Sequence, residues 1–317
     1  MILEVVAPAS LPLGLIRIEH TYALLGITLQ HPPVDLFAQT APALSVTGAR
    51  ADLARAQAER CLQAAQTGER AELEIELAIP NLMGLGSEAM LGLSAARALA
   101  ELKILPSSST DTPALAQAID LEPEHALEVW SFHAGGLLLV DVQAGTRLRR
   151  HEIAHPDKTA WGVVMHFPRH QPDLSETLEA DRLALLLNAA PHLSAETGRL
   201  LDEALWPALA RDDLETFGRA LVTIQNLNHE ALARAGTPLP FSADEEAIFE
   251  IMRTGGCAGW GRSLTGLTRF GFIRGADPSV EVRRKLSSRL GFYGGVVMAS
   301  ICDNRGARHQ MKMHRLC

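Results

Sequence analysis

The stretch that decides the fold is Pro80-Asn-Leu-Met-Gly84-Leu85-Gly86-Ser87-Glu88-Ala-Met90. It follows residues 72–79, ELEIELAI, whose alternation of apolar and acidic residues predicts a half-buried strand. After it comes an Ala/Leu-rich run over 88–103 that predicts a helix. A strand, two glycines and a helix that opens with serine have the geometry of a phosphate cradle. Glycines let the backbone approach an anion, and the free amides at a helix start bind it.

Two interpretations of this turn stay open on the pattern alone. In the first, the turn amides hold a phosphate and Ser87 offers its hydroxyl to phosphate or Mg²⁺. In the second, Gly84 and Gly86 only make a strand–helix turn, and Ser87 is an ordinary N-cap. The stretch is neither a dinucleotide fingerprint nor a P-loop, because the third glycine and the Gly-Lys-Ser/Thr of those motifs are missing.

A second glycine-rich stretch, GGCAGWGRS over 255–263, lies between a predicted helix and a predicted strand. Four glycines within seven residues are more than a turn needs, which favours a loop held close to a ligand or to another backbone. Arg262 can pair with phosphate or carboxylate there. The alternative is a glycine-rich connection without a ligand, in which the Trp260 side chain packs into the core.

Around these stretches the chain predicts a mixture of strands and helices. Strands are expected over 2–7, 13–18, 25–30, 34–39, 161–167, 267–273 and 295–301, with a hairpin of 136–142 and 147–154. Helices are expected over 51–66, 243–252 and 279–290, and over most of 174–234 with breaks near 191–194 and 211–213. After residues 156–161 the predicted pattern changes from mixed strands and helices to nearly continuous helix, which predicts a domain boundary between residues 158 and 159.

Composition narrows the class of protein. The chain has 317 residues, 47% of them hydrophobic, and a formal net charge of −8. An acidic chain with 5% aromatic residues is not expected to bind nucleic acid. The start of the chain does not have the pattern of a signal peptide, no apolar run is long enough to span a membrane, and the four cysteines are scattered. A cytoplasmic protein without a membrane partner is therefore expected.

Two groups of histidine and cysteine residues have side chains that can bind a metal, but neither group is expected to form a metal site. His151-Glu-Ile-Ala-His155 matches the zinc-protease pattern, but it follows a hairpin and precedes a proline, so both histidines are expected on an extended segment without a metal between them. Cys302, His309, His314 and Cys317 match no common zinc spacing, and a soluble basic tail is the expectation for this end of the chain.

The stretch 79–90 resembles the second motif of the GHMP kinase superfamily, P-x-x-x-G-L-G-S. More narrowly, the chain resembles the β-ribofuranosylaminobenzene 5′-phosphate synthase branch. The counterparts of that branch's motifs run in order along the chain: SLPLGLI (10–16), GGL (135–137), WPAL (206–209), FG (217–218), IQ (224–225), AGWG (258–261) and DNRGA (303–307).

This resemblance implies an α+β fold of two GHMP domains. Residues 1–158 would form a ribosomal-protein-S5-like domain with the phosphate motif, residues 159–317 a ferredoxin-like domain, and the site would lie between them. Ser87 and Glu88 are the candidate Mg²⁺ ligands, no organic cofactor is expected, and a homodimer is implied. The candidate substrate- and phosphate-binding residues are Gly84, Leu85, Gly86, Ser87, Gly135, Gly136, Gly259, Trp260, Gly261 and Arg262.

The activity implied is phosphoribosyl transfer from phosphoribosyl pyrophosphate to 4-aminobenzoate or a similar aromatic acid. CO₂ and pyrophosphate are lost, in methanopterin-type biosynthesis, and the residues point to no catalytic side chain. An ATP-dependent small-molecule kinase and a non-catalytic paralogue that binds a pathway metabolite or a partner protein are the alternatives. The chain departs from the family at Glu88, at Ser10-Leu-Pro12 and over 122–133, where acids replace arginines. Glu179 stands where the family has a Glu, and it is expected to be structural.

Overall fold

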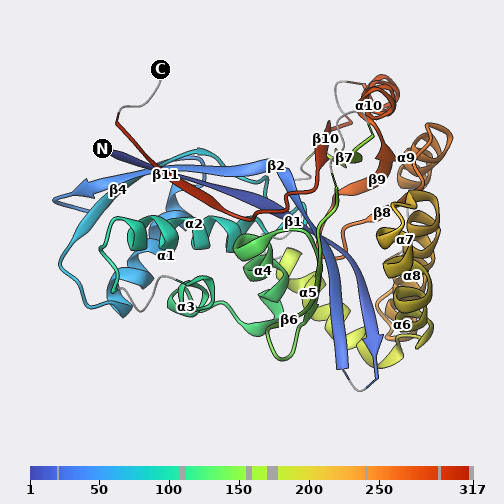
Figure 1. The fold of residues 1–317 in the computed structure, drawn as a ribbon, viewed down its shortest axis with the longest axis horizontal. Coiled ribbons are helices and arrows are strands. Elements are labelled where there is room, and N and C mark those ends of the chain that lie inside the picture. The colour runs from blue at the N-terminus through green and yellow to red at the C-terminus, as the bar shows by residue number, and fades with distance from the viewer. Residues whose placement is uncertain are drawn as a thin grey trace.

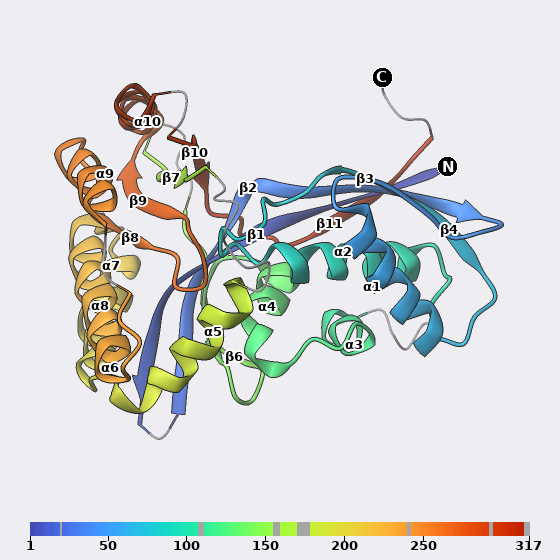
Figure 2. The same cartoon turned by 180° about the vertical axis from the view of Figure 1, so that it is seen from behind.

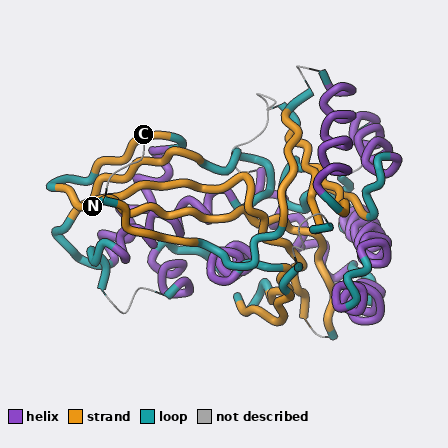
Figure 3. The backbone as a smooth tube through the Cα atoms, turned by 45° about the horizontal axis from the view of Figure 1, so that its top comes forward, coloured by secondary structure: helices purple, strands orange, loops and turns teal. Residues whose placement is uncertain are grey.

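The computed structural model describes residues 1–19, 21–106, 111–154, 159–169, 178–239, 242–291 and 294–313. These residues form two β-sheets with helices packed on them, which confirms the predicted α+β class (Figure 1). The first half of the chain builds the larger sheet and the helices along one of its faces. The second half builds the smaller sheet, the helices beside it and one edge strand of the larger sheet (Figure 1). Figure 3 shows that helices of this half lie at the opposite end of the molecule from the N-terminus.

Two long strands, β1 (Ile2–Ile18) and β2 (Thr21–Ala41), form a hairpin. The hairpin belongs to the larger sheet and also contacts the helices and the smaller sheet that the second half of the chain builds. The sequence predicted four short strands here, separated by prolines, and that prediction is wrong. The prolines sit where the pairing of the two strands shifts, next to the jumps at Ala7/Ala9 and Pro12/Gly14. A bulge leaves residues out of the ladder, so a proline there costs no strand hydrogen bond and the strand continues.

The larger sheet has the order β11-β1-β2-β4-β3, with β5 also paired to β2 and β6 to β5. The hairpin of β5 and β6 is confirmed, and in β4 the predicted alternation places Leu73 and Ile75 in the core. It is wrong for Leu77, the last residue of β4, whose side chain is 49% exposed. The bounds of the remaining strands of this sheet are β3 (Ser45–Gly48), β4 (Arg70–Leu77), β5 (Leu137–Asp141), β6 (Thr146–His151) and β11 (Arg308–Lys312).

The end of the chain is not the free basic tail that the sequence predicted. Strand β11 pairs with β1 at the edge of the larger sheet, and the Lys312 ammonium lies 2.5 Å from a carboxylate oxygen of Glu4. Cys302 is buried and makes an isolated bridge to Leu29, and His309 lies in β11. His314 and Cys317 lie outside the described residues.

Four helices and one 3-10 turn cover one face of the larger sheet (Figure 2). The predicted helix after the glycine turn is confirmed as α2, and it is buried along nearly its whole length because α1, α3, α4 and β1 surround it. The bounds are α1 (Ala51–Ala64), α2 (Ser87–Glu101), α3 (Thr112–Ala118), η2 (Pro123–His125) and α4 (Ala126–Ala134).

The smaller sheet has the order β10-β7-β9-β8, and α8, α9 and α10 pack on it. Its strands are β7 (Trp161–Phe167), β8 (Gly259–Arg262), β9 (Arg269–Arg274) and β10 (Val296–Ile301). The helical elements of the second half of the chain are α5 (Leu178–Ala189), η3 (Ala190–His192), α6 (Glu196–Leu200), the π-helical turn η4 (Leu201–Leu205), α7 (Trp206–Ala210), α8 (Leu214–Arg234), α9 (Ala243–Thr254) and α10 (Ala276–Leu290).

Both predicted breaks in the long helical run are confirmed, by η3 near residue 191 and by the turn at 211–213. None of the helices in the described part of the chain is long and apolar enough to cross a bilayer. The strands change from the larger to the smaller sheet between β6 and β7, while β11 returns to the larger one. The boundary between residues 158 and 159 stays a prediction.

Candidate functional site

The turn between β4 and α2 is held in a backbone conformation that favours glycine. Gly84 and Gly86 have φ angles of 65° and 71°, and Gly86 is the N-cap of α2. Ser87 is therefore the first helical residue and not the N-cap, and its buried hydroxyl has no hydrogen-bond partner within the described residues. The interpretation of Ser87 as an ordinary capping residue is excluded, and a buried hydroxyl facing no acceptor needs another role.

A loop from the second half of the chain, residues 263–268, lies directly on this turn. The Ser263 hydroxyl donates to the Gly84 carbonyl at 2.8 Å, and the Thr268 hydroxyl donates to the Met83 carbonyl at 2.7 Å. The packing is so close that a side chain on Gly84 would overlap the Gly266 amide nitrogen and the Ser263 hydroxyl. The turn is therefore fixed by contacts with the second half and lies between the two halves of the molecule.

Three carboxylates surround the start of α2. Glu179, from α5, accepts a hydrogen bond from the Gly84 amide at 2.8 Å. Glu128, from α4, lies 3.4 Å from the Ser10 hydroxyl, and a Cβ on Gly86 would stand 2.7 Å from its Cγ. Glu88 is the outermost of the three, with 58% of its side chain exposed, and pairs with Arg50 at 3.3 Å.

The surroundings disfavour the charged form of two of these acids. Burial raises the pKa of Glu179 to about 7, and the charges of Glu128 and Glu88 add to the effect while the Gly84 amide opposes it. Burial also raises the pKa of Glu128, and the nearby His125, 3.9 Å away, offsets part of that rise. A helix start that attracts anions is thus occupied by carboxylates that are themselves costly to ionise there.

These acids open into a cavity of about 310 Å³ at the start of α2. It is bounded by the turn and α2 on one side, by α4 on another, and by α5 and the 263–268 loop from the second half. In both views of the ribbon, α5 lies beside α4 (Figures 1 and 2). The lining side chains that carry polar groups are Asn81, Glu88, His125, Glu128, Glu179 and Thr265.

The residues at this helix start fit Mg²⁺ as it is usually bound. Mg²⁺ takes hard oxygen ligands, commonly one or two carboxylates, with water and substrate phosphates completing the shell. The unpartnered Ser87 hydroxyl and the Glu128 carboxylate beside Gly86 supply oxygens of that kind. Glu88, the other predicted ligand, lines the same cavity but is paired with Arg50. Among the described residues no group of three or more His, Cys, Asp and Glu is placed to hold a metal.

The second glycine-rich stretch is placed elsewhere. Gly259, Trp260 and Gly261 lie in β8, where a Cβ on Gly259 would come within 2.6 Å of the Gly218 Cα of α8. A Cβ on Gly261 would stand 2.7 Å from the Gln225 amide carbon. The glycines therefore allow a strand to lie against a helix backbone, and the residues that face the turn are those that follow, 263–268.

Arg262 is engaged within the protein. Its guanidinium lies 3.3 Å from Glu245, which also accepts from Arg269 at 3.1 Å, and all three side chains are largely buried. Burial alone would raise the pKa of Glu245. The Ser242 amide and the two arginines outweigh that effect and hold the pKa below its ordinary value. The carboxylate that Arg262 pairs with in the structure is thus that of Glu245 in α9, and a role of Arg262 in binding substrate stays a prediction.

Gly135 and Gly136 lie at the other end of α4 from the cavity. The Gly136 amide donates to the Asp303 carbonyl at 2.6 Å, and a Cβ on Gly135 would stand 2.8 Å from the Gly306 amide nitrogen. Neither glycine lines the cavity at α2. They position the loop that leads to β11. Of the predicted residues, only Gly86 and Glu88 line that cavity, with Gly84, Leu85 and Ser87 in the turn beneath it.

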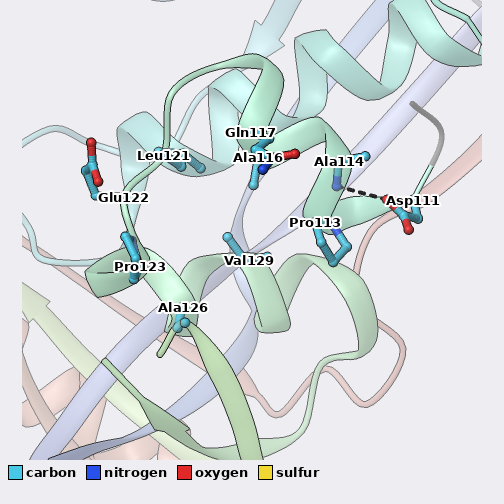
Figure 4. A pocket seen from close by; sticks show the side chains of 11 residues that line it. Asp111, Pro113, Ala114, Ala116, Gln117, Leu121, Glu122, Pro123, Ala126 and Val129 are labelled. Atoms are coloured by element: carbon cyan, nitrogen blue, oxygen red, sulfur yellow. Dashed lines mark hydrogen bonds between the residues drawn. The ribbon is translucent and has the colours of Figure 1, made fainter. Parts of the chain in front are cut away.

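Two further features lie outside the cavity at α2. A hollow of about 470 Å³ between α3 and α4 is lined mainly by small and apolar side chains, and its Asp111 caps α3 by accepting from the Ala114 amide at 2.9 Å (Figure 4). His151 is the last residue of strand β6, so the extended geometry predicted for it is confirmed. His155 lies outside the described residues.

Comparison with known proteins shows the fold. No family model matches the chain, and no curated protein does. Homoserine kinase from Cytophaga hutchinsonii superposes with a TM-score of 0.62 at 14% identity, over 98% of this chain and 97% of that chain. Mevalonate diphosphate decarboxylase from Trypanosoma brucei gives 0.66 at 12% identity, over the whole of both chains. Methanococcus jannaschii mevalonate kinase gives 0.63 at 14% identity, over 96% and 98%. These are GHMP kinase superfamily members, and this chain has the two-domain GHMP fold.

Two residues of the site carried little signal in the sequence. Glu128 lies within the acidic stretch 122–133, which was visible only as a loss of arginines. Glu179 stood at a family position but was expected to be structural, and its bond to Gly84 joins residues 95 positions apart. Contacts of that range depend on how the two halves pack, and no local pattern encodes them.

Proposed function

We propose that the chain is a small-molecule enzyme that binds a phosphate-bearing substrate at the start of α2, with Mg²⁺ held by Ser87 and Glu128. The observation that carries this is the Ser87 hydroxyl in the first turn of α2, at the positive end of the helix, which is buried and has no hydrogen-bond partner among the described residues. The Glu128 carboxylate lies beside the neighbouring Gly86. The GHMP fold supports it, because the proteins that share the fold are named as kinases and a diphosphate decarboxylase.

The chain's own groups have distinct tasks in this proposal. The amides of the turn and the α2 dipole bind the phosphate end of the substrate. Ser87 and Glu128 would hold Mg²⁺, which would supply positive charge to neutralise a leaving pyrophosphate or phosphate. Asn81 and Thr265 orient the rest of the substrate from the cavity wall. The 263–268 loop and α5 close the cavity from the second half and limit the access of water.

The specific reaction we propose is phosphoribosyl transfer from phosphoribosyl pyrophosphate to 4-aminobenzoate or a similar aromatic acid. CO₂ and pyrophosphate leave, as in methanopterin-type biosynthesis. Positive charge develops at the ribose C1 as pyrophosphate departs, so a site rich in carboxylates stabilises the sugar side of that transition state as well as the metal. Glu128 and Glu179 supply carboxylates on the cavity wall for the sugar side, and Mg²⁺ would neutralise the negative charge of the leaving pyrophosphate.

Two alternatives each have one observation in their favour. An ATP-dependent small-molecule kinase is supported by the kinases among the proteins of this fold. A non-catalytic paralogue that binds a pathway metabolite or a partner protein is supported by Glu179, which already occupies the Gly84 amide. A homodimer and a cytoplasmic location remain predictions, and light scattering on the purified chain measures the first.

A ligand panel tests the proposal. Isothermal titration with phosphoribosyl pyrophosphate, ATP and 4-aminobenzoate, each with and without Mg²⁺, is expected to show Mg²⁺-dependent binding of phosphoribosyl pyrophosphate. Release of labelled CO₂ from carboxyl-labelled 4-aminobenzoate then reports turnover. Glu128→Gln should abolish the Mg²⁺ dependence, while Glu122→Gln, an exposed acid just before η2, should leave it intact. Binding of ATP alone would favour the kinase, and binding of none of the three would favour the paralogue.

A further inference from the structure

The contact between Glu179 and Gly84 joins the two halves of the molecule at the proposed phosphate site. Glu179 lies in the first turn of α5, in the second half of the chain, and its Oε1 accepts the Gly84 amide hydrogen at 2.8 Å. That amide belongs to the turn that leads into α2, where a phosphate oxygen would bind. The carboxylate thus makes the kind of contact that an anionic ligand would make.

Charged groups around Glu179 do not neutralise it. Glu128 approaches from α4 and Glu88 from α2, and both raise its pKa, while Arg50 opposes them but is paired with Glu88. His125 faces Glu128. On the same helix, the Arg182 guanidinium donates to the Gly266 carbonyl and is directed to the 263–268 loop. Three acids, His125 and two arginines that are engaged elsewhere, Arg50 and Arg182, therefore surround the place of the phosphate.

This arrangement has a direct consequence for anions. A free phosphate group would have to displace Glu179 from Gly84 and then lie among three carboxylates, which repel it. A phosphate group that brings a divalent cation meets the opposite situation, since the same carboxylates attract the cation and the net repulsion falls. The site therefore distinguishes ligands by whether they carry a bound cation.

We infer that Glu179 is a specificity-determining residue that occupies the anion position at Gly84 and so excludes phosphate compounds that carry no divalent cation. The inference rests on the proposed function, because it assumes that the start of α2 is where phosphate binds. Glu179 acts by holding the amide and by its charge, and two substitutions separate these effects. Glu179→Ala frees the amide and removes the charge, whereas Glu179→Gln removes the charge but keeps an oxygen that can accept from Gly84.

Inorganic pyrophosphate is the probe, titrated calorimetrically at pH 8 with EDTA or with Mg²⁺. The unmodified chain is expected to bind it only with Mg²⁺. Glu179→Ala should gain metal-free binding by at least about tenfold, and Glu179→Gln should gain less, since a hydrogen bond to a charged group is worth that much. Asp181→Asn, an exposed acid on the same turn of α5, should behave like the unmodified chain. Melting curves confirm that each variant is folded, and removing a buried acid is not expected to unfold the chain.

The outcomes separate this inference from the proposed function. Mg²⁺-dependent binding without any gain in the Glu179 variants would overturn the inference and leave the phosphate site standing. Tight metal-free binding by the unmodified chain would overturn it too. Absence of pyrophosphate binding in every variant, with or without Mg²⁺, would overturn both. An equal gain in Glu179→Gln and Glu179→Ala would show that charge alone acts and would overturn the part of the inference in which Glu179 occupies the Gly84 amide.

Discussion

The two glycine-rich segments of this chain look alike in sequence and do different work in the structure. In the turn before α2, Gly84 and Gly86 have positive φ angles and leave a buried serine and three carboxylates around a helix start. In β8, Gly259 and Gly261 lie in an extended strand, and glycine is required at both positions because α8 packs against them. The first segment lines a cavity, whereas the second packs closely against a helix.

The difference shows that glycine content alone does not locate a ligand. A glycine is required wherever a Cβ would collide, and a neighbouring helix backbone imposes that as firmly as a phosphate does. What separates the two segments is the polar groups that they leave: a hydroxyl without a partner in one, and in the other an Arg262 guanidinium matched to Glu245. Four experiments test this contrast.

The largest expected effect is on the ion network behind the second segment. Glu245→Gln leaves Arg262 and Arg269 buried without their carboxylate, and breaking such a pair costs about 3–5 kcal/mol of unfolding free energy. Denaturant unfolding measures it, with Glu246→Gln, an exposed acid on the same helix turn, as the control. If Glu245→Gln were as stable as that control, Arg262 would not be held for structure and the contrast between the segments would fail.

The next effect is a dependence of stability on pH, which comes from the first segment. The pKa of Glu179 is raised from 4.5 to about 7, so the folded state keeps a proton that the unfolded chain releases in that range. Its contribution is fully present below pH 4.5 and is lost as the pH rises through 7, by about 3 kcal/mol in total. The stability of the unmodified chain minus that of Glu179→Gln should therefore fall between pH 5 and 8. A flat difference would mean that Glu179 is not buried among like charges.

Much of the fold was accessible from the sequence, because its signals are local. The alternation at Leu73 and Ile75, the apolar face of α1 and the breaks near 191 and 211 each arise within a few residues, and all are confirmed. The prolines of β1 and β2 led to a wrong prediction of four short strands. At a bulge a proline costs no strand hydrogen bond, and the position of a bulge depends on how the two strands pair. The edge strand β11 was missed because a short polar strand has no periodicity of its own.

The site was less accessible for the same physical reason. The turn at 84–87 was predicted from its pattern, but the groups that decide its chemistry come from α4 and α5. The residues Gly135, Gly136 and Gly259 to Gly261 were predicted at the site because motifs were read as ligand contacts, whereas each glycine there meets another part of the backbone or a core side chain. Only the packing of the two halves separates these cases.

A smaller effect concerns the glycines of the second segment themselves. Gly259→Ala places a methyl group within 2.6 Å of the Gly218 Cα, and overpacking of this kind costs about 1–3 kcal/mol. Gly256→Ala meets nothing within 4 Å, so its cost is that of a positive φ alone, about 1 kcal/mol. Urea unfolding of both variants gives the comparison. Equal costs would mean that β8 can move away from α8 and that close packing is not the reason for Gly259.

The smallest effect on stability is expected at Ser87, and it sharpens the contrast most. The hydroxyl has no hydrogen-bond partner in the described part of the chain, so Ser87→Ala removes an unsatisfied buried polar group, and the free energy of unfolding should change by less than about 0.5 kcal/mol or rise. Binding should behave in the opposite way. If Ser87 holds Mg²⁺ together with Glu128, the substitution weakens Mg²⁺-dependent binding of phosphoribosyl pyrophosphate, while Gly259→Ala, once corrected for the folded fraction, leaves that affinity unchanged. Titration calorimetry on the two variants under one set of conditions measures both. Unchanged affinity in Ser87→Ala would remove Ser87 from the metal site, and the start of α2 would then be, like β8, a place where a glycine and a small residue serve packing alone.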